Sequence, residues 1–514
     1  MRQTNNATAT RSITPIPLGT TSEFLAPPAP RWTPVREAWC SIRCQTATAV
    51  LASCYLAEGT LKHRRVVPIT SKAENSHRTT RVVALASLVS TVVTALLIGL
   101  LPGSARAAFS APFTVSPAGV KGPQIASDAD GDAIAVWSGF DGTDWRVEAR
   151  RISADGSLGH LKVLSAASPK PLFPHIASGA YGDAVAVWTQ LNSRETNQRV
   201  KARRISPGGA LGPVKTLSRA KRKARAAEVA TDAHGDAVAV WLQAHRGTWR
   251  VKARRIFAGG ALGPVRSLSS ASQKAEGPQI ASDARADVVA AWSQFDGANW
   301  RVKARRISAA GALGRVKTLS RRGHDAGLSA IASGAHGNAV AVWSQFNSRG
   351  TNRRVKARRI SRKGALGRVK TLSPAGQYAL APQVASDADG NAIVVWMRSG
   401  GATEQIQARQ VSAAGVLGPV QILSDSRYAY SPQIASDAHG DAVAVWYGHD
   451  ADAAPASIQA RTISAAGVLG PVQTLSAGGP ATQPRVEAAA QGDAVAVWLR
   501  LEGTQWRVEG SLGP

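Results

Sequence analysis

The sequence predicts an all-β fold, a β-propeller of eight four-stranded blades. Tryptophans end nearly identical segments at intervals of 50–53 residues, and the octet HGDAVAVW occurs at both 234–241 and 439–446. A repeat of roughly 40–50 residues that holds several short strands is typical of propeller blades. The repeated tryptophans, which we expect to be structural core residues, are Trp137, Trp188, Trp241, Trp292, Trp343, Trp396, Trp446 and Trp498.

One unit, residues 278–320, illustrates the four expected strands. The first covers 279–282 and ends at a tight turn. In other units this turn has the sequence Asp-Gly or His-Gly, and such pairs suit a two-residue hairpin. The second strand ends at the repeated tryptophan, and the third covers 300–308. A glycine-containing turn then leads into the fourth strand, within 314–320.

The second strand should be buried between neighbouring sheets. In the segment AVAVW, one face carries Ala237, Ala239 and Trp241, and the other carries Val238 and Val240. Because side chains alternate along a strand, both faces are apolar. We expect the small alanines to let sheets approach closely while the tryptophan fills the wider end of the wedge.

The two ends of the repeat region predict closure of the ring. The last unit stops at WRVEGSLGP and lacks the final VKTLS strand, whereas APFTVSPAG at 111–119 aligns with GRVKTLSPAG at 367–376. A blade completed by strands from both ends removes the exposed sheet edges. The alternative architecture is an open β-repeat array.

Residues 1–107 indicate processing rather than a folded domain. Residues 1–77 form an N-terminal extension without a clear periodic pattern. A translation start downstream of Met1 would account for this extension. Residues 78–107 resemble a signal peptide: two arginines, an uncharged apolar run at 82–101 and then a small-x-small site. The run is also long enough for an uncleaved membrane anchor. We therefore expect 108–514 to be a propeller that is secreted or held at the cell surface.

The repeat also resembles a known group of proteins. The pattern D-x-x-G-[DN]-A-V-A-V-W, followed by an A-R-[RQT]-[IV]-S segment, is similar to tandem propeller-like repeats of secreted bacterial surface proteins. That resemblance implies export and surface exposure but no particular activity. SDADGDAIAVW, residues 127–137, has a weaker likeness to the Asp-box of sialidase-type propellers.

Metal, cofactor and catalytic chemistry have little support in the sequence. Asp128, Asp130 and Asp132 alternate as in a calcium loop, but most units supply too few carboxylates for six to eight oxygen ligands. We therefore predict no metal and no cofactor, and a turn in which Asp bonds its own backbone. No nucleophile elbow, zinc motif or phosphate loop occurs, and all three cysteines precede residue 55. Catalytic residues stay unknown, and the protein is more plausibly not an enzyme.

Charge is the most informative functional signal. The chain carries a net charge of +29, and residues 190–373 alone hold 37 basic against 9 acidic residues. Such an excess is typical of proteins that bind anionic partners. The expected contacts form a cationic stripe along the third strands of units two to five: Lys201, Arg203, Arg204, Lys252, Arg254, Arg255, Lys303, Arg305, Arg306, Lys356, Arg358 and Arg359.

The predicted function is a non-enzymatic binding or scaffold module for a polyanion. Acidic glycans, wall polymers or the backbone of extracellular DNA fit the stripe, whereas sequence-specific nucleic acid recognition is not expected. A solvated basic face copied by repeat duplication would give the same charge without a ligand. The alternative function is a carbohydrate-active enzyme, a glycosidase or lyase, with its site in the channel loops; the tyrosines share no repeat position that would mark such a site. The oligomeric state is unknown.

Overall fold

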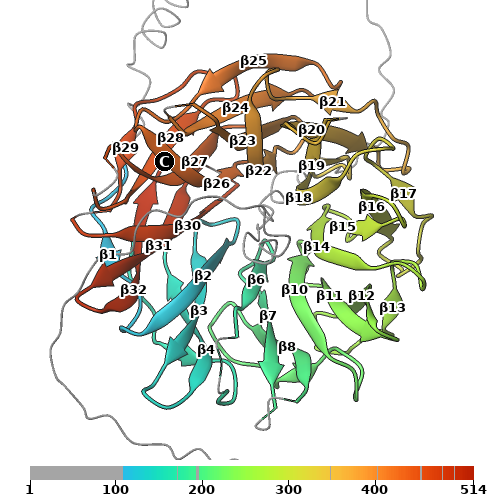
Figure 1. Cartoon of the computed structure of the whole chain (residues 1–514). Helices are drawn as coiled ribbons and strands as arrows, with labels where there is room; N and C mark the ends of the chain where they lie inside the picture. Colours follow the sequence, from blue (N-terminus) through green and yellow to red (C-terminus); the bar gives the residue numbers. More distant parts are fainter. Residues whose placement is uncertain are drawn as a thin grey trace, which may run out of the picture. The chain divides into compact units, whose positions relative to one another are not determined.

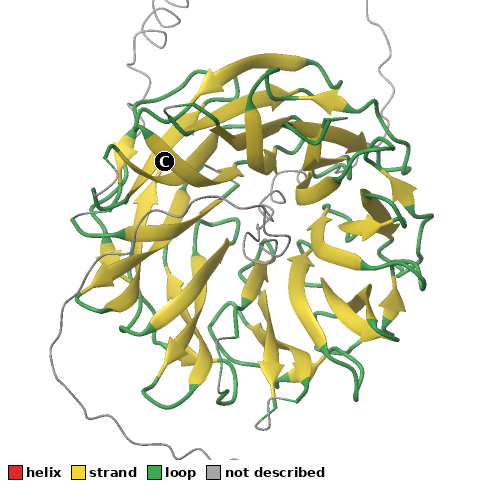
Figure 2. Ribbon diagram, viewed as in Figure 1, coloured by secondary structure: helices red, strands yellow, loops and turns green. Residues whose placement is uncertain are grey.

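The computed structural model describes residues 108–514, apart from 169, 171, 193–195, 348, 402, 452–453, 477 and 491. The described residues form eight antiparallel four-stranded sheets arranged as the blades of a ring (Figure 1). Strands and loops make up this part of the chain, with no helix in it (Figure 2). The structure confirms the predicted eight-bladed propeller, and not the alternative open β-repeat array.

The predicted extension 1–77 and the predicted signal or anchor 78–107 lie outside the described residues. Within the described part, no helix has the length and apolarity that crossing a membrane requires.

The first strand of each blade lies nearest the centre of the ring (Figure 1). In blade 4 this strand begins at Ala275, four residues before the predicted start. A bulge between Glu276 and Gln279 lets the strand continue through the Gly-Pro pair that marked its predicted start. From blade 1 to blade 8 the first strands are β2 (Val120–Ser127), β6 (His175–Ser178), β10 (Ala224–Thr231), β14 (Ala275–Ser282), β18 (Ala326–Ser333), β22 (Tyr378–Ser386), β26 (Tyr428–Ser436) and β30 (Ala481–Ala488).

The second strand is buried on both faces, as predicted. In blade 3, Ala237, Ala239 and Trp241 pack against blade 2, while Val238 and Val240 pack against blade 4. All eight repeated tryptophans are 0% exposed and pack into the cores shared by neighbouring blades. The second strands are β3 (Ala133–Phe140), β7 (Ala184–Leu191), β11 (Ala237–His245), β15 (Val288–Phe295), β19 (Ala339–Phe346), β23 (Ala392–Ser399), β27 (Ala442–His449) and β31 (Ala494–Glu502).

The third strand carries the cations and pairs along its length with the second strand. Its valine and alanine are buried, whereas the side chains between them are partly exposed. The third strands are β4 (Trp145–Ile152), β8 (Gln198–Ile205), β12 (Thr248–Ile256), β16 (Trp300–Ile307), β20 (Arg353–Ile360), β24 (Gln405–Val411), β28 (Ser457–Ile463) and β32 (Gln505–Gly513).

The fourth strand forms the outer edge of each blade and is shorter than predicted. Most fourth strands pair over two residues only, and a serine after the strand takes over the next backbone bond. In blade 3, the Val251 N–H donates to Ser269 Oγ at 3.0 Å. The fourth strands are β5 (Lys162–Val163), β9 (Lys215–Thr216), β13 (Arg266–Ser267), β17 (Lys317–Thr318), β21 (Lys370–Thr371), β25 (Leu417–Ile422), β29 (Gln473–Thr474) and, completing blade 8, β1 (Phe113–Thr114).

Closure of the ring follows the predicted alignment. Strand β1 pairs with β32, placing Phe113 opposite Gly510. The Val508 N–H donates to Ser116 Oγ at 2.8 Å, the same bond that the serine after the fourth strand accepts in other blades. Val115 is buried in the core that blade 8 shares with blade 1. Strand β1 therefore takes the place of the fourth strand that the final repeat lacks.

The motif D-x-x-G-[DN] is explained by the turn between the first and second strands. Asp232 Oδ1 accepts the N–H groups of His234 and Asp236, and Gly235 has a φ of +79°. Asp236 Oδ1 in turn accepts the N–H of Ala258, in the turn before the fourth strand. The motif ties two turns of one blade together, as expected for a structural Asp turn.

We predict that Trp241→Ala lowers the free energy of unfolding by about 3–5 kcal/mol, because it leaves a cavity between blades 2 and 3. The midpoint and slope of urea unfolding would measure this loss. Trp249→Ala, at a half-buried position of the same blade, is the control and should cost less. A Trp241→Ala variant as stable as the wild type would contradict the wedge role of this side chain.

Candidate functional site

The cationic stripe lies on the third strands, but its side chains are engaged within the ring. Arg254 Nε donates to Gly263 O of its own blade at 2.7 Å. Its Nη1 donates to Thr216 O and Leu217 O of blade 2, each at 3.2 Å. Burial lowers the pKa of Arg254, but arginine stays charged. One guanidinium therefore links two neighbouring blades through three carbonyl groups.

The same link recurs around the ring. Each equivalent arginine donates through Nε to a glycine carbonyl of its own blade and through Nη1 to the end of the preceding blade. In blade 1 the acceptor from the preceding blade is Val115 O of the closing segment, at 3.1 Å. The equivalents of Arg254 are Arg150, Arg203, Arg305, Arg358, Arg409 and Arg461.

The next arginine of the stripe reaches in the opposite direction, to the following blade. Arg204 Nη1 donates to Gly235 O at 2.6 Å, and Arg306 Nη1 donates to Gly337 O at 2.8 Å. Arg255 donates through Nη2 to Ala286 O at 3.0 Å. The side chains involved are Arg204, Arg255, Arg306 and Arg359. These arginines fasten each blade to the first turn of its neighbour.

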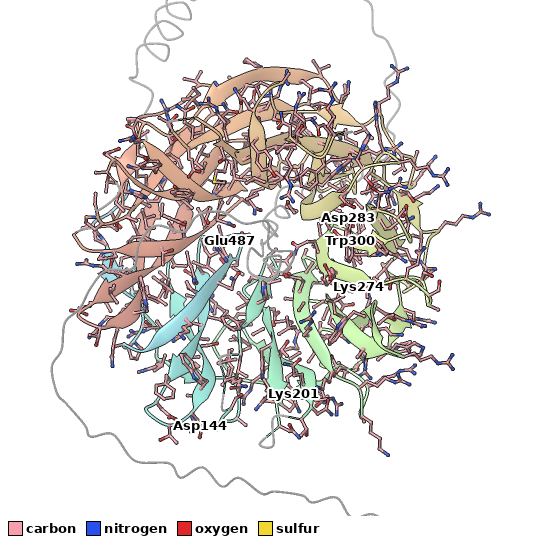
Figure 3. The ribbon with its side chains drawn as sticks, in the orientation of Figure 1. Asp144, Lys201, Lys274, Asp283, Trp300 and Glu487 are labelled. Atoms are coloured by element: carbon pink, nitrogen blue, oxygen red, sulfur yellow. The ribbon has the colours of Figure 1, made fainter. Side chains whose placement is uncertain are left out.

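The lysines of the stripe donate hydrogen bonds to side chains of the fourth strand. Lys201 Nζ donates to Thr216 Oγ1 at 2.7 Å, and burial lowers the pKa of this lysine. The equivalent lysines, Lys252, Lys303 and Lys356, donate to Ser267, Thr318 and Thr371. Figure 3 shows Lys201 toward the outer side of the ring.

In the lysine blades, the tryptophan N–H is accepted by a glutamine two residues later. Trp292 Nε1 donates to Gln294 Oε1 at 2.9 Å. In blades 1, 6, 7 and 8 a Glu or Gln replaces the lysine and accepts instead, as Gln459 does from Trp446 at 2.7 Å. The glutamine of the second strand is then absent, and Gly448 stands at that position in blade 7.

The exposed cations gather elsewhere, where blade 2 passes into blade 3. The basic run RAKRKAR at 219–225 covers the loop between β9 and β10 and the first two residues of β10, and Arg219, Lys221, Arg222 and Lys223 are exposed. No Asp or Glu occurs in 196–227 or 237–275. We name this group the loop patch; its members are Arg219, Lys221, Arg222, Lys223, Arg225, Arg246, Arg250 and Lys252. Its loop cations were outside the predicted stripe, although the charge run was visible in the sequence.

A histidine and a tryptophan lie within the loop patch. Arg222 Nη1 lies 3.3 Å from His245 Nδ1. Partial burial and then the charges of Arg250 and Arg222 lower the pKa of His245, so the field here is positive. The Arg225 guanidinium lies over the Trp249 ring, 4.4 Å from its centroid. Lys274 covers Trp300 in the same way in blade 4, at 5.3 Å (Figure 3).

A second polar cluster lies between blades 6 and 7. The Tyr430 and Tyr447 rings stack with their centroids 5.4 Å apart, and the His449 ring follows at 6.1 Å from Tyr430. Burial and then the neighbouring Glu404 carboxylate raise the pKa of Tyr430. The expectation that tyrosines share no repeat position was wrong, since Tyr378 and Tyr428 both begin first strands. Both lie 18 residues before the repeated tryptophan of their unit, so the equivalence was already present in the sequence.

Buried ionisable groups also occupy the first strands of some blades. His175 Nδ1 lies 3.0 Å from Glu228 Oε2, and both side chains are buried. Glu487 replaces the alanine that other blades carry, and burial raises its pKa to about 8 (Figure 3). Because the folded state favours the protonated carboxyl, Glu487 destabilises the fold increasingly as pH rises from about 4.5 to 8.

Among the described residues, no group of three or more His, Cys, Asp or Glu side chains could hold a metal ion. The turn carboxylates instead accept backbone N–H groups. Burial is the main cause that raises the pKa of Asp128 to about 6.

Comparisons with known proteins add little beyond the fold. No protein-family model matches the chain, and no curated protein matches it. Among solved structures, it is similar to a puromycin hydrolase (TM-score 0.45, 15% identity, 74% of this chain and 58% of that one). It is also similar to a PL25 ulvan lyase, with a TM-score of 0.46 and 9% identity over 68% of this chain and 95% of that one. A third similar structure is the β-propeller domain of the trilobed protease from Pyrococcus furiosus, with a TM-score of 0.42 and 7% identity over 71% of this chain and 97% of that one.

We predict that Arg254→Gln lowers the free energy of unfolding by about 1–3 kcal/mol, because carbonyl groups of two blades lose a charged donor. Arg254→Lys should recover only part of this loss, since an ammonium group does not reproduce the guanidinium fork. Urea unfolding would measure both changes. Arg315→Gln, at an exposed position, is the control and should stay within about 0.5 kcal/mol of the wild type. Equal losses in Arg254→Gln and Arg315→Gln would contradict the link between blades.

Proposed function

We propose that this propeller binds a polyanion through the loop patch, with the cationic stripe of blades 2 to 5 in a secondary role. The observation that carries the proposal is the gathering of eight cations on the loop before β10, on β10, on the turn between β11 and β12, and on β12. The lowered pKa of His245 supports a positive field at this surface. Exposed cations without neighbouring carboxylates attract anionic polymers at long range.

The cationic stripe has a secondary role in this proposal. An arginine has five N–H donors, and the blade links described above use only some of them. Its charge therefore adds to the potential of blades 2 to 5, while its position is held by the carbonyl groups. The primary contacts are the exposed loop cations, which are free to meet a polymer without breaking the ring.

The proposed ligands are acidic glycans, wall polymers or the backbone of extracellular DNA. Export of the protein is part of the same proposal, supported by the basic, apolar and small-residue order of 78–107. Contacts to backbone charges carry no sequence information, so sequence-specific nucleic acid recognition is not proposed.

The test compares two triple variants that remove the same charge. We expect Arg219→Gln, Arg222→Gln and Lys223→Gln together to weaken binding of dextran sulfate, polygalacturonate or duplex DNA by roughly tenfold or more, with a shallower salt dependence. The control, Arg315→Gln, Lys317→Gln and Arg368→Gln together, removes exposed cations from the fourth-strand regions of blades 4 and 5. Titration calorimetry across a salt series would measure both. Equal losses in the two variants, or no binding by the wild type, would overturn the proposal.

A second candidate function is a carbohydrate-active enzyme at the cluster between blades 6 and 7. The observation that favours it is the Glu404 carboxylate beside the Tyr430 hydroxyl, within an aromatic cluster that includes His449. Arg427 adds an exposed cation, which lies over the Tyr428 ring at 5.1 Å. A phenol beside a carboxylate is a recognised arrangement for acid, base or nucleophilic chemistry.

This second function predicts turnover that depends on one hydroxyl group. We expect Tyr430→Phe to abolish release of new chain ends from a panel of acidic and neutral polysaccharides. Tyr378→Phe, at the first strand of blade 6, is the matched control and should keep full turnover. If the wild type cleaves nothing in the panel, or if Tyr430→Phe is fully active, the cluster is not a catalytic site.

A further inference from the structure

His245 lies at the centre of the loop patch and is the titratable residue there that changes charge near neutral pH. It ends β11, and a two-residue turn follows in which Arg246 and Gly247 have φ values of +48° and +79°. Three elements surround it: the loop before β10, this turn, and the start of β12. They place Arg222, Arg246 and Arg250 around one imidazole ring.

The charges that act on His245 are all positive. Partial burial, and then Arg250, Arg222, Arg246 and Lys252, hold its pKa below the ordinary value. From the neighbouring blade, Arg199 of β8 donates to Ser218 O of the same loop at 2.7 Å. An ion placed here that carries negative charge would therefore reverse the local field.

Arg250 shows that donor capacity in the site is unused. Its Nη2 donates to Ala271 O at 2.7 Å, but its buried Nε has no hydrogen-bond partner in the described part of the chain. Arg222 Nη1 faces His245 Nδ1, where the contact is long at 3.3 Å. Both guanidinium groups are therefore placed to donate stronger hydrogen bonds to a negatively charged acceptor.

We propose that Arg222, His245 and Arg250 form an oxyanion subsite, which takes one carboxylate or sulfate group of the polymer and binds a proton at His245 with it. The inference rests on the proposed polyanion function and names the group recognised. When the anion offsets the arginine charges, the imidazole takes a proton from the solvent at Nδ1. Nδ1 then becomes a donor, and the Arg222 N–H turns from the ring to the anion.

Proton uptake and anion binding strengthen each other by the same factor. Between the pKa of the free protein and the higher pKa of the bound state, His245 carries a charge in the complex that it lacks in the free protein. The affinity for the polymer therefore rises as pH falls from 8 to 5.5, and protons are taken up on binding in between. A carboxylate polymer and a sulfate polymer both stay charged over this range, so the protein is the source of the effect.

The experiment is titration calorimetry of the full chain with polygalacturonate and with dextran sulfate, at pH 5.5 and 8, in two buffers of different ionisation heat. We expect proton uptake of up to about one per bound subsite and an affinity about 3- to 10-fold higher at pH 5.5. His245→Gln should remove the proton uptake and the pH dependence but keep the affinity at pH 8. Arg222→Gln should weaken binding at both pH values.

The control is His336→Gln, which removes an imidazole that is 61% exposed at a turn of blade 5 and should change nothing. Equal proton uptake by the wild type and His245→Gln would overturn the subsite while leaving polyanion binding intact. Binding of only one of the two polymers would assign the subsite to that group. If neither polymer binds the wild type, the proposed function and the subsite fail together.

Discussion

The contact between neighbouring blades is the constraint on which the rest of this structure depends. Each second strand has apolar side chains on both faces, so no blade can bury its own core alone. The repeated tryptophan fills the space against the preceding blade and is fully buried in all eight units. In blades 2 to 5, two arginines also donate to backbone carbonyl groups of the neighbouring blades, one toward the preceding and one toward the following blade. Closing the ring with β1 extends this contact to the junction between blades 8 and 1.

The charge of the protein therefore has two origins. In the third strands, cations are building elements that satisfy carbonyl groups between blades and hydroxyl groups at the outer edge. The lysines of blades 2 to 5 occur where Gln accepts the tryptophan N–H from the second strand, and in the other blades a Glu or Gln takes their place. Part of the charge asymmetry thus follows from how each blade satisfies one buried indole. The loop patch is different, because no such internal role accounts for its exposed cations.

The positions that differ between repeats carry the functional proposals. Arg222, His245, Tyr430 and Glu487 each occur at equivalent positions in at most two blades. A repeated residue is required by every blade for packing, whereas a residue on a loop or turn that differs between blades is free of that requirement. Arg222 and His245 belong to this second kind, whereas Arg250 is a third-strand residue with counterparts at Arg199, Arg301 and Arg354.

The sequence by itself determined the repeat, the eight blades, the buried second strand and the closing strand, because each depends on side-chain alternation and spacing along the chain. It also showed the basic run at 219–225 and the Asp turns. Only the tertiary structure decided which cations are engaged, since two of the three acceptors of Arg254 lie in another blade, 37 and 38 residues away. The same holds for Glu404 of blade 6 beside Tyr430 of blade 7. A pattern along one strand reports which face a side chain takes, but its partners across a blade junction depend on how the ring closes.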